Sequence, residues 1–228
     1  MARPKTDISA EKHRILQAAE AVMSKRGANC VTMSAVARQA GMSQSNIYRF
    51  FDDRDHLLLC AANRWFNGIL ALTEMQDAMP ISAAEKLKES LLGGMRIYRQ
   101  RFEEDRGLFD GYMSLASHFP DVIIAQVSAL RNRFGLWVQD CLQENGVDIA
   151  LTEDATNLFL DMTILFRNPH LLRDYRKFMT EKRATSVANV FLDMLTSEYR
   201  LRAALGLEQA QPAPSHLPLA QYALFHDQ

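Results

Sequence analysis

Polar side chains that can read DNA follow one another in one short stretch of the sequence. Gln44, Ser45 and Asn46 carry hydrogen-bond donors and acceptors that match the edges of base pairs in a major groove. Tyr48 and Arg49 carry groups that bind backbone phosphates. These residue types, placed so close together, predict recognition of double-stranded DNA.

A helix-turn-helix is the element that would present these side chains. Thr32 can cap a first helix, whose apolar residues recur at helical spacing. Gly41 can end that helix in a left-handed conformation, and Ser43 can cap the second helix. Ile47 and Phe51 then give the second helix an inward face, so its polar residues would point into a major groove.

Residues 31–58 read V-T-M-S-A-V-A-R-Q-A-G-M-S-Q-S-N-I-Y-R-F-F-D-D-R-D-H-L-L, and this pattern resembles the tetracycline-repressor (TetR) family of bacterial transcription regulators. Its most specific part is G-M-S-x-x-x-I-Y-x-x-F followed by the helix start R-D-x-L. The resemblance covers residues 1–65 well and implies a DNA-binding regulator. Beyond that point it is a likeness of helix number and layout.

The resemblance implies which residues of this chain contact DNA. Ser34 matches a position where the family often has a longer basic side chain, so a base contact there would reach less far. Asp52 and Asp53 are expected to serve the cap of the next helix instead. The expected DNA contacts are Thr32, Ser34, Ser43, Gln44, Ser45, Asn46, Tyr48, Arg49 and Arg54.

Charge is distributed unevenly along the 228 residues. Residues 1–50 contain eight Lys or Arg and three acidic residues, a net charge of +5, so the remainder carries −6 of the total of −1. A basic head on an acidic body is typical of a DNA-binding domain joined to another module, although an ordinary solvated surface would also allow it. Arg3 and Lys5 form a basic arm that would enter a minor groove, or else stay in solvent.

The rest of the chain predicts further helices and no strands. Helices are expected at 9–26 with Ser9 as the cap, 54–76, 83–104 with a Ser82–Glu85 capping box, 106–118, 120–145, 152–167 and 181–205. The fold class is therefore all-α. The expected domains are a helix-turn-helix domain at 1–53, linked by the helix 54–76, a larger ligand-binding and dimerisation domain at 54–206, and a tail at 207–228.

Aromatic and methionine residues of the second domain form stripes that most often are simply core. In the TetR family the corresponding helices often enclose a pocket for a small inducer, and such residues suit a hydrophobic or amphipathic molecule. The candidate pocket residues are Phe66, Leu70, Met95, Tyr98, Phe102, Phe109, Tyr112, Met113, Phe134 and Trp137.

The two late helices, 152–167 and 181–205, carry apolar stripes that look wide for the core of one chain. In the family, the last two long helices pair with their copies across a two-fold axis. The resemblance therefore implies a homodimer that presents two recognition helices to a palindromic operator. The expected interface residues are Leu158, Phe159, Met162, Phe166, Val187, Val190, Phe191, Met194 and Leu195.

Other classes of protein receive little support. No G-x-S-x-G, H-E-x-x-H or phosphate-binding glycine loop occurs, so no enzyme and no cofactor is expected. His56 and Cys60 have the spacing of a pair of metal ligands but no nearby third ligand.

The expected location is the cytoplasm, with the nucleoid when DNA is bound. The sequence shows no signal peptide or transmembrane run, and its three cysteines are widely spaced. Two rivals to a ligand-released repressor stay open: a DNA-bound scaffold that recruits a protein, and a small helical enzyme.

Overall fold

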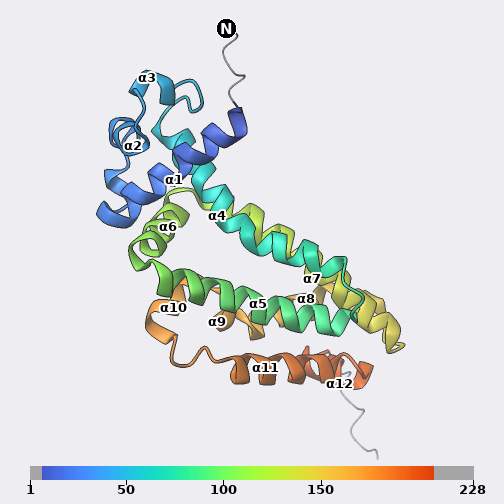
Figure 1. Cartoon of the computed structure of the whole chain (residues 1–228). Helices are drawn as coiled ribbons and strands as arrows, with labels where there is room; N and C mark the ends of the chain where they lie inside the picture. The colour runs from blue at the N-terminus through green and yellow to red at the C-terminus, as the bar shows by residue number, and fades with distance from the viewer. Residues whose placement is uncertain (1–6, 208–228) are drawn as a thin grey trace, which may run out of the picture.

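The computed structural model describes residues 7–207, and Figure 1 shows them as an assembly of helices. The all-α prediction is confirmed, since these residues contain no strand. The α-helices are α1 (Ile8–Arg26), α2 (Met33–Ala40), α3 (Gln44–Ile47), α4 (Arg54–Asp77), α5 (Ala83–Glu104), α6 (Arg106–His118), α7 (Pro120–Glu144), α8 (Thr152–Met162), α9 (Ile164–Arg167), α10 (Pro169–Tyr175), α11 (Glu181–Met194) and α12 (Glu198–Ala204). Two 3-10 turns, Ala28–Cys30 and Ile149–Leu151, complete the list.

Local capping chemistry explains where the early helices begin. Ser43 Oγ accepts a hydrogen bond from the backbone N–H of Asn46 at 3.3 Å, and Asp53 Oδ1 accepts one from His56 at 2.7 Å. The predicted capping box is present, because Glu85 Oε2 accepts from the backbone N–H of Ser82 at 3.1 Å. The predicted cap of the first helix was wrong by two residues, since Asp7 rather than Ser9 accepts the capping bonds.

The late helices are shorter than the sequence predicts. The expected helix 152–167 is divided at Thr163, whose buried hydroxyl donates to the Phe159 carbonyl at 2.6 Å. The expected helix 181–205 ends at Met194, and the extended backbone of Ser197 separates it from α12. Both breaks fall inside segments whose apolar residues continue at helical spacing. For that reason the sequence predicted one helix in each segment.

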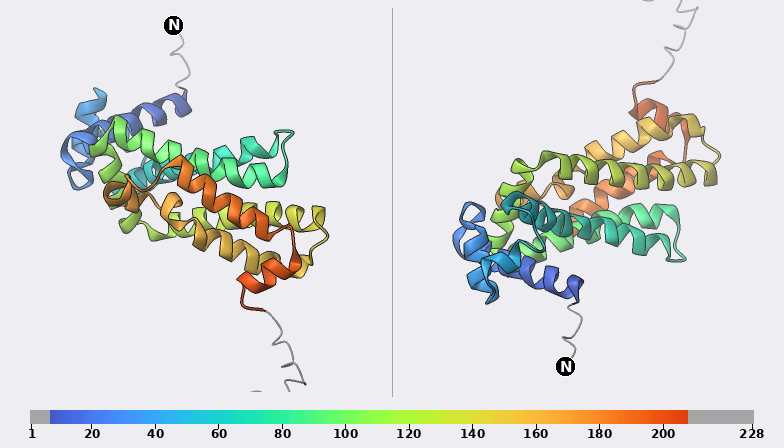
Figure 2. Two further views of the ribbon diagram at one scale, coloured as in Figure 1. Left: turned by 90° about the horizontal axis from the view of Figure 1, so that it is seen from below. Right: turned by 90° about the horizontal axis from the view of Figure 1, so that it is seen from above.

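The helices form two regions that share contacts (Figures 1 and 2). The helices α1, α2 and α3 gather at one end, and α4 leads from them along the larger bundle. In that bundle α4 packs against α5 and α7, α7 packs against α8, and α5 packs against α11. No helix in residues 7–207 combines the length and apolarity needed to cross a membrane.

Helix α6 connects the two regions because it packs directly against α1. Two glycines allow the close approach: a Cβ on Gly107 would lie 2.3 Å from the Ser24 carbonyl oxygen, and one on Gly111 would lie 2.4 Å from Met23 Cγ. Beside them, the Tyr112 hydroxyl donates to Glu20 Oε1 at 2.5 Å. The end formed by α1, α2 and α3 is therefore in contact with a helix of the larger bundle as well as joined to it through α4.

Candidate nucleic-acid interface

The short helix α3 presents a polar outer face on an apolar anchor. Ile47 is fully buried, whereas Gln44 and Ser45 are exposed and Asn46 is half-buried. Tyr48, directly after the helix, leaves 47% of its surface exposed. The burial pattern thus fixes the helix by one face and frees the side chains of the other face for a ligand.

The turn between α2 and α3 is fixed by the backbone conformation of Gly41 and by a hydrogen bond from α1. Gly41 takes the left-handed conformation, with a φ of 62°, that closes α2. Arg14 of α1 donates from Nη2 to the Ala40 carbonyl at 2.8 Å, and this link was not predicted from the sequence. An exposed arginine 26 positions away gives no local signal, because only the tertiary fold brings it to the end of α2.

The N-terminal turn of α2 offers a second polar edge. Thr32 Oγ1 accepts a bond from the backbone N–H of Ala35 at 3.2 Å and lies 3.2 Å from the Ser34 hydroxyl. Both side chains are exposed. The start of a helix carries free N–H groups and a positive dipole end, so this edge suits a phosphate.

Arg49 is exposed beside α3, and Arg54 has a different environment. Arg49 makes one long contact, 3.4 Å, to Asn46 Oδ1. Arg54 donates from Nε to the Val31 carbonyl at 2.7 Å and from Nη2 to the Ala28 carbonyl at 3.1 Å. These bonds tie the start of α4 to the segment before α2, and they give Arg54 a structural role beside the phosphate contact that the sequence predicts.

We expect Arg54→Ala to lower the stability of the protein, because two backbone carbonyls lose charged donors. Such a loss costs about 1–3 kcal/mol. Arg49→Ala is the matched control: it should change stability by less than about 0.5 kcal/mol and instead weaken binding to all DNA sequences. Thermal unfolding separates the two effects, and an unchanged melting temperature for Arg54→Ala would leave Arg54 with the phosphate contact alone.

The two acidic residues near the interface serve the helix start, as predicted. Asp53 caps α4, and the Asp52 carboxylate lies 3.1 Å from His56 Nδ1. The exposed cations around α1 and α2 include Lys12, Arg14 and Arg38. The basic arm, Arg3 and Lys5, lies outside the described residues, as does the tail from residue 208 onward.

The candidate pocket residues form core rather than the wall of one cavity. Eight of the ten are buried, and several pack on one another: the Phe102 and Phe109 rings lie 5.2 Å apart, and the Phe134 and Trp137 rings lie 5.8 Å apart. Leu70 and Met113 are partly buried. A filled aromatic cluster and the lining of a cavity have the same apolar spacing in sequence, so the pattern alone did not separate them.

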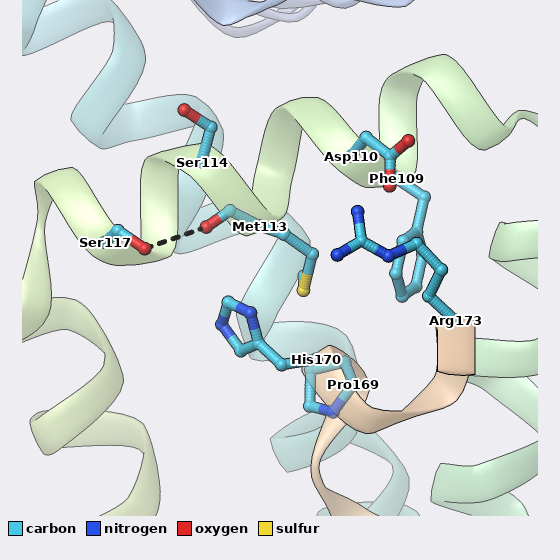
Figure 3. A pocket seen from close by; sticks show the side chains of 8 residues that line it. All are labelled: Phe109, Asp110, Met113, Ser114, Ser117, Pro169, His170 and Arg173. Atoms are coloured by element: carbon cyan, nitrogen blue, oxygen red, sulfur yellow. Dashed lines mark hydrogen bonds between the residues drawn. The ribbon is translucent and has the colours of Figure 1, made fainter. Parts of the chain in front are cut away.

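A pocket of about 270 Å³ lies between α6 and α10 (Figure 3). Phe109 and Met113 are the two predicted residues that line it. His170 and Arg173 face them from α10. The remaining lining residues are Asp110, Ser114, Ser117 and Pro169. Apolar and charged groups therefore meet at this pocket, which is smaller than most sites for drug-sized ligands.

The expected interface residues divide into two groups. Phe159, Phe166, Phe191 and Leu195 are buried inside the single chain, and the Phe159 and Phe191 rings lie 5.0 Å apart. These four residues belong to the chain's own core, because the single chain leaves at most 3% of their surface exposed. The other five, Leu158, Met162, Val187, Val190 and Met194, retain exposed surface, and Ile164, 50% exposed, lies near them in sequence.

No group of three metal-binding side chains occurs among residues 7–207. Cys60 is half-buried on α4, and burial raises the pKa of its thiol. Cys141 is buried, and desolvation raises the pKa of its thiol to about 12. Neither thiol is therefore activated for nucleophilic chemistry at neutral pH.

Comparison with known proteins locates the similarity at this interface. The family model for bacterial regulatory proteins of the tetR family matches residues 15–61. An uncharacterized helix-turn-helix regulator of Mycobacterium tuberculosis is 28% identical over 137 residues, which span 58% of this chain and 65% of the relative. The repressor KstR of Mycolicibacterium smegmatis is 41% identical over 63 residues, 28% of this chain and 31% of its own.

Two solved structures share the fold across most of the chain. A TetR-like transcriptional regulator from Rhodococcus sp. RHA1 has a TM-score of 0.52 at 16% identity and covers 90% of this chain and 100% of its own. FadR from Bacillus subtilis, solved in complex with stearoyl-CoA, has a TM-score of 0.54 at 15% identity. The match covers 82% of this chain and 98% of the FadR chain. At these identities the likeness concerns the fold alone.

Proposed function

This chain belongs to the TetR family of bacterial regulatory proteins, and from that premise we propose that it is a homodimeric, sequence-specific DNA-binding transcription regulator. We further propose that it is a repressor released by a small hydrophobic or amphipathic ligand. The observation that carries the proposal is the exposed polar face of α3, supported on the buried Ile47. The proposed place of action is the bacterial cytoplasm, on the nucleoid when DNA is bound.

The proposed DNA contacts fall into two classes. Gln44, Ser45 and Asn46 lie on the helix that would enter the major groove and would read base edges. Thr32, Ser34, Ser43, Tyr48 and Arg49 surround them and would bind phosphates or sugars. Arg54 would hold the start of α4 in place and would also contact a phosphate. We propose residues 1–53 as the DNA-binding domain and 54–206 as the domain for ligand binding and dimerisation.

The proposed mechanism couples ligand and DNA through the spacing of two recognition helices. A dimer on a palindrome needs them about 34–36 Å apart, one turn of duplex. A ligand that binds more tightly to another spacing lowers DNA affinity by its differential binding to the two states. The contact between α6 and α1 is a physical route for this change, because α6 also lines the pocket with α10.

Selection of bound duplexes from a random pool tests the proposal. The full-length chain should enrich an inverted repeat whose half-sites lie one helical turn apart. A pool that shows no enriched sequence after repeated rounds would contradict sequence-specific DNA binding by this chain.

We expect Gln44→Ala and Asn46→Ala to change which bases are selected. Each lost base contact should cost roughly 1–3 kcal/mol against the preferred site and relax the preference at one position of both half-sites. Gln143→Ala, an exposed glutamine near the end of α7, is the control and should select the wild-type sequence. If both α3 variants also select that sequence, other residues read the bases.

A DNA-bound scaffold without an inducer is the second candidate. The observation that favours it is the filled core, where most of the expected pocket residues are buried. FadR of Bacillus subtilis, which has the same fold, was solved with stearoyl-CoA and supports the ligand-released alternative. Release of the operator by a small molecule alone would separate the two candidates.

A further inference from the structure

Two arginines of the larger helical bundle have no acidic partner in the part of the chain that the structure describes. Arg101 of α5 donates from Nη1 to the Trp65 carbonyl at 2.8 Å, and its guanidinium lies 4.5 Å from the centre of the Trp65 ring. Arg167, at the end of α9, donates to Thr163 Oγ1 at 2.9 Å and to the Leu160 carbonyl at 2.7 Å. Within residues 7–207 neither guanidinium forms a salt bridge.

Partial burial makes these two charges costly in the absence of an anion, since both arginines are only partly exposed. Desolvation lowers the pKa of Arg101 and lowers the pKa of Arg167 to about 10. Arginine keeps its positive charge in proteins at neutral pH. Glu20, Glu104 and Asp161 act on them only from beyond salt-bridge distance. A partly buried charge with no close counter-charge is unfavourable, and a bound anion would lower that cost.

Two buried neutral side chains lie beside the arginines. Tyr98 of α5 and Gln126 of α7 are 7% and 6% exposed. Burial raises the pKa of Tyr98, and the positive charges of Arg101 and Arg167 oppose this rise, so both act on its hydroxyl. Gln126 lies next to Tyr98 and donates from Nε2 to the Phe66 carbonyl at 2.5 Å. Donors from α5, α7 and α9 therefore converge on one region.

Both arginines are partly exposed, so they are not sealed in the core. The sealed side-chain atoms without a hydrogen bond in the described chain are Glu11 Oε2, Gln76 Oε1 and Ser90 Oγ, so the unbonded nitrogens of the two arginines are not sealed. Gly68 leaves space for Arg101, since a Cβ there would lie 2.4 Å from Arg101 Nη2. The apolar surroundings include Trp65, whose ring lies 5.7 Å from that of Tyr98.

We propose that Tyr98, Arg101, Gln126 and Arg167 form an anion centre that binds the carboxylate of an amphipathic ligand. A carboxylate matches the planar donor fork of a guanidinium, and its single charge costs less to bury than a phosphate dianion. The apolar part of the ligand lies against the Trp65 ring, and side chains of the filled aromatic cluster move to admit it. The inference rests on the proposed function, because it names the chemical class of the effector.

Binding of octanoate, decanoate and palmitate, each compared with its methyl ester, tests the centre in the full-length protein. Calorimetry should show that at least one acid binds roughly tenfold or more tightly than its ester, since a charge-assisted hydrogen bond is lost in the ester. Arg101→Met and Arg167→Met should each remove this preference. Arg131→Met, which changes an arginine of α7 whose side chain is 41% exposed and paired with Glu153, should keep it.

A further variant keeps the test valid if an arginine variant does not fold. Gly68→Ala retains both charges but displaces the Arg101 guanidinium, so it should also weaken acid binding. Equal affinity for acid and ester, no binding of any of the three acids, or an unchanged preference in the arginine variants would each overturn the anion centre. Decanoyl-CoA binding with no binding of free acids would overturn it too.

The duplex selection separates this inference from the proposed function. A protein that selects an operator but binds acid and ester equally keeps the regulatory proposal and loses the anion centre. A protein that binds carboxylates through Arg101 and Arg167 but selects no DNA keeps the centre and loses the regulatory proposal.

Discussion

Val190→Glu is expected to dissociate the proposed dimer and to remove most of its operator affinity. Val190 lies on α11 and is 52% exposed, with Val187 and Met194 partly exposed on the same helix. Burying such a side chain in a partner contributes about 1.5–3 kcal/mol. A two-fold interface contains every substitution twice, and an unpaired carboxylate in an apolar contact adds a desolvation cost.

The choice of Val190 follows from the burial of its neighbours. Phe191→Glu would place a charge in the chain's own core, since Phe191 is fully buried against Phe159. That variant would unfold and say nothing about pairing. Ile164→Glu, at a 50% exposed position of α9, repeats the test on a second element, and Gln143→Glu adds the same charge at an exposed site of α7.

Sedimentation and operator binding measure the outcome together. The Val190→Glu and Ile164→Glu variants should be folded monomers with weak operator binding, and Gln143→Glu should resemble the wild type. Folded variants that stay dimeric would place the interface elsewhere. Folded monomers that still bind the full operator tightly would break the link between pairing and function.

Gly107→Ala is expected to separate α6 from α1 and to destabilise the protein. The added Cβ would meet the Ser24 carbonyl oxygen at 2.3 Å, and a backbone atom in α1 has little freedom to move aside. Such overpacking costs about 1–3 kcal/mol. Because α1 supports α2 through Arg14, the displacement should also lower DNA affinity.

Gly135→Ala is the matched control for this prediction. Its Cβ would lie 3.6 Å from Thr156 Oγ1, an ordinary contact, so alanine should raise stability by up to about 1 kcal/mol through its better helix propensity. Thermal unfolding compares the two variants. A Gly107→Ala protein as stable as the wild type would show that α1 and α6 separate without cost.

Local chemistry explains why the start of the fold could be predicted from the sequence. The caps at Thr32 and Ser43 and the left-handed Gly41 act within a few residues, so their spacing carries enough information. The ends of the later helices depend on local features that leave a weaker signal in the sequence. Thr163 bonds back to the preceding turn, and Ser197 takes an extended backbone, while apolar residues continue on both sides.

Tertiary contacts account for the rest of the differences at the site. Arginine is usually an exposed residue that suits a phosphate contact. In the folded chain, however, Arg54 also bonds to the carbonyls of Val31 and Ala28, which lie far from it in sequence. The late apolar stripes were wide for a comparable reason: Phe159 and Phe191 face the chain's own core, and Val190 faces outward. Periodicity identifies an apolar face but not the molecule that covers it.

The number of chains bound to one selected duplex tests the central proposal most directly. Sedimentation should show two copies of the chain on the full inverted repeat, and scrambling one half-site should weaken binding strongly, because only one recognition helix then finds its bases. A single copy bound to the duplex, with equal affinity for the intact and the half-scrambled site, would contradict a two-fold regulator.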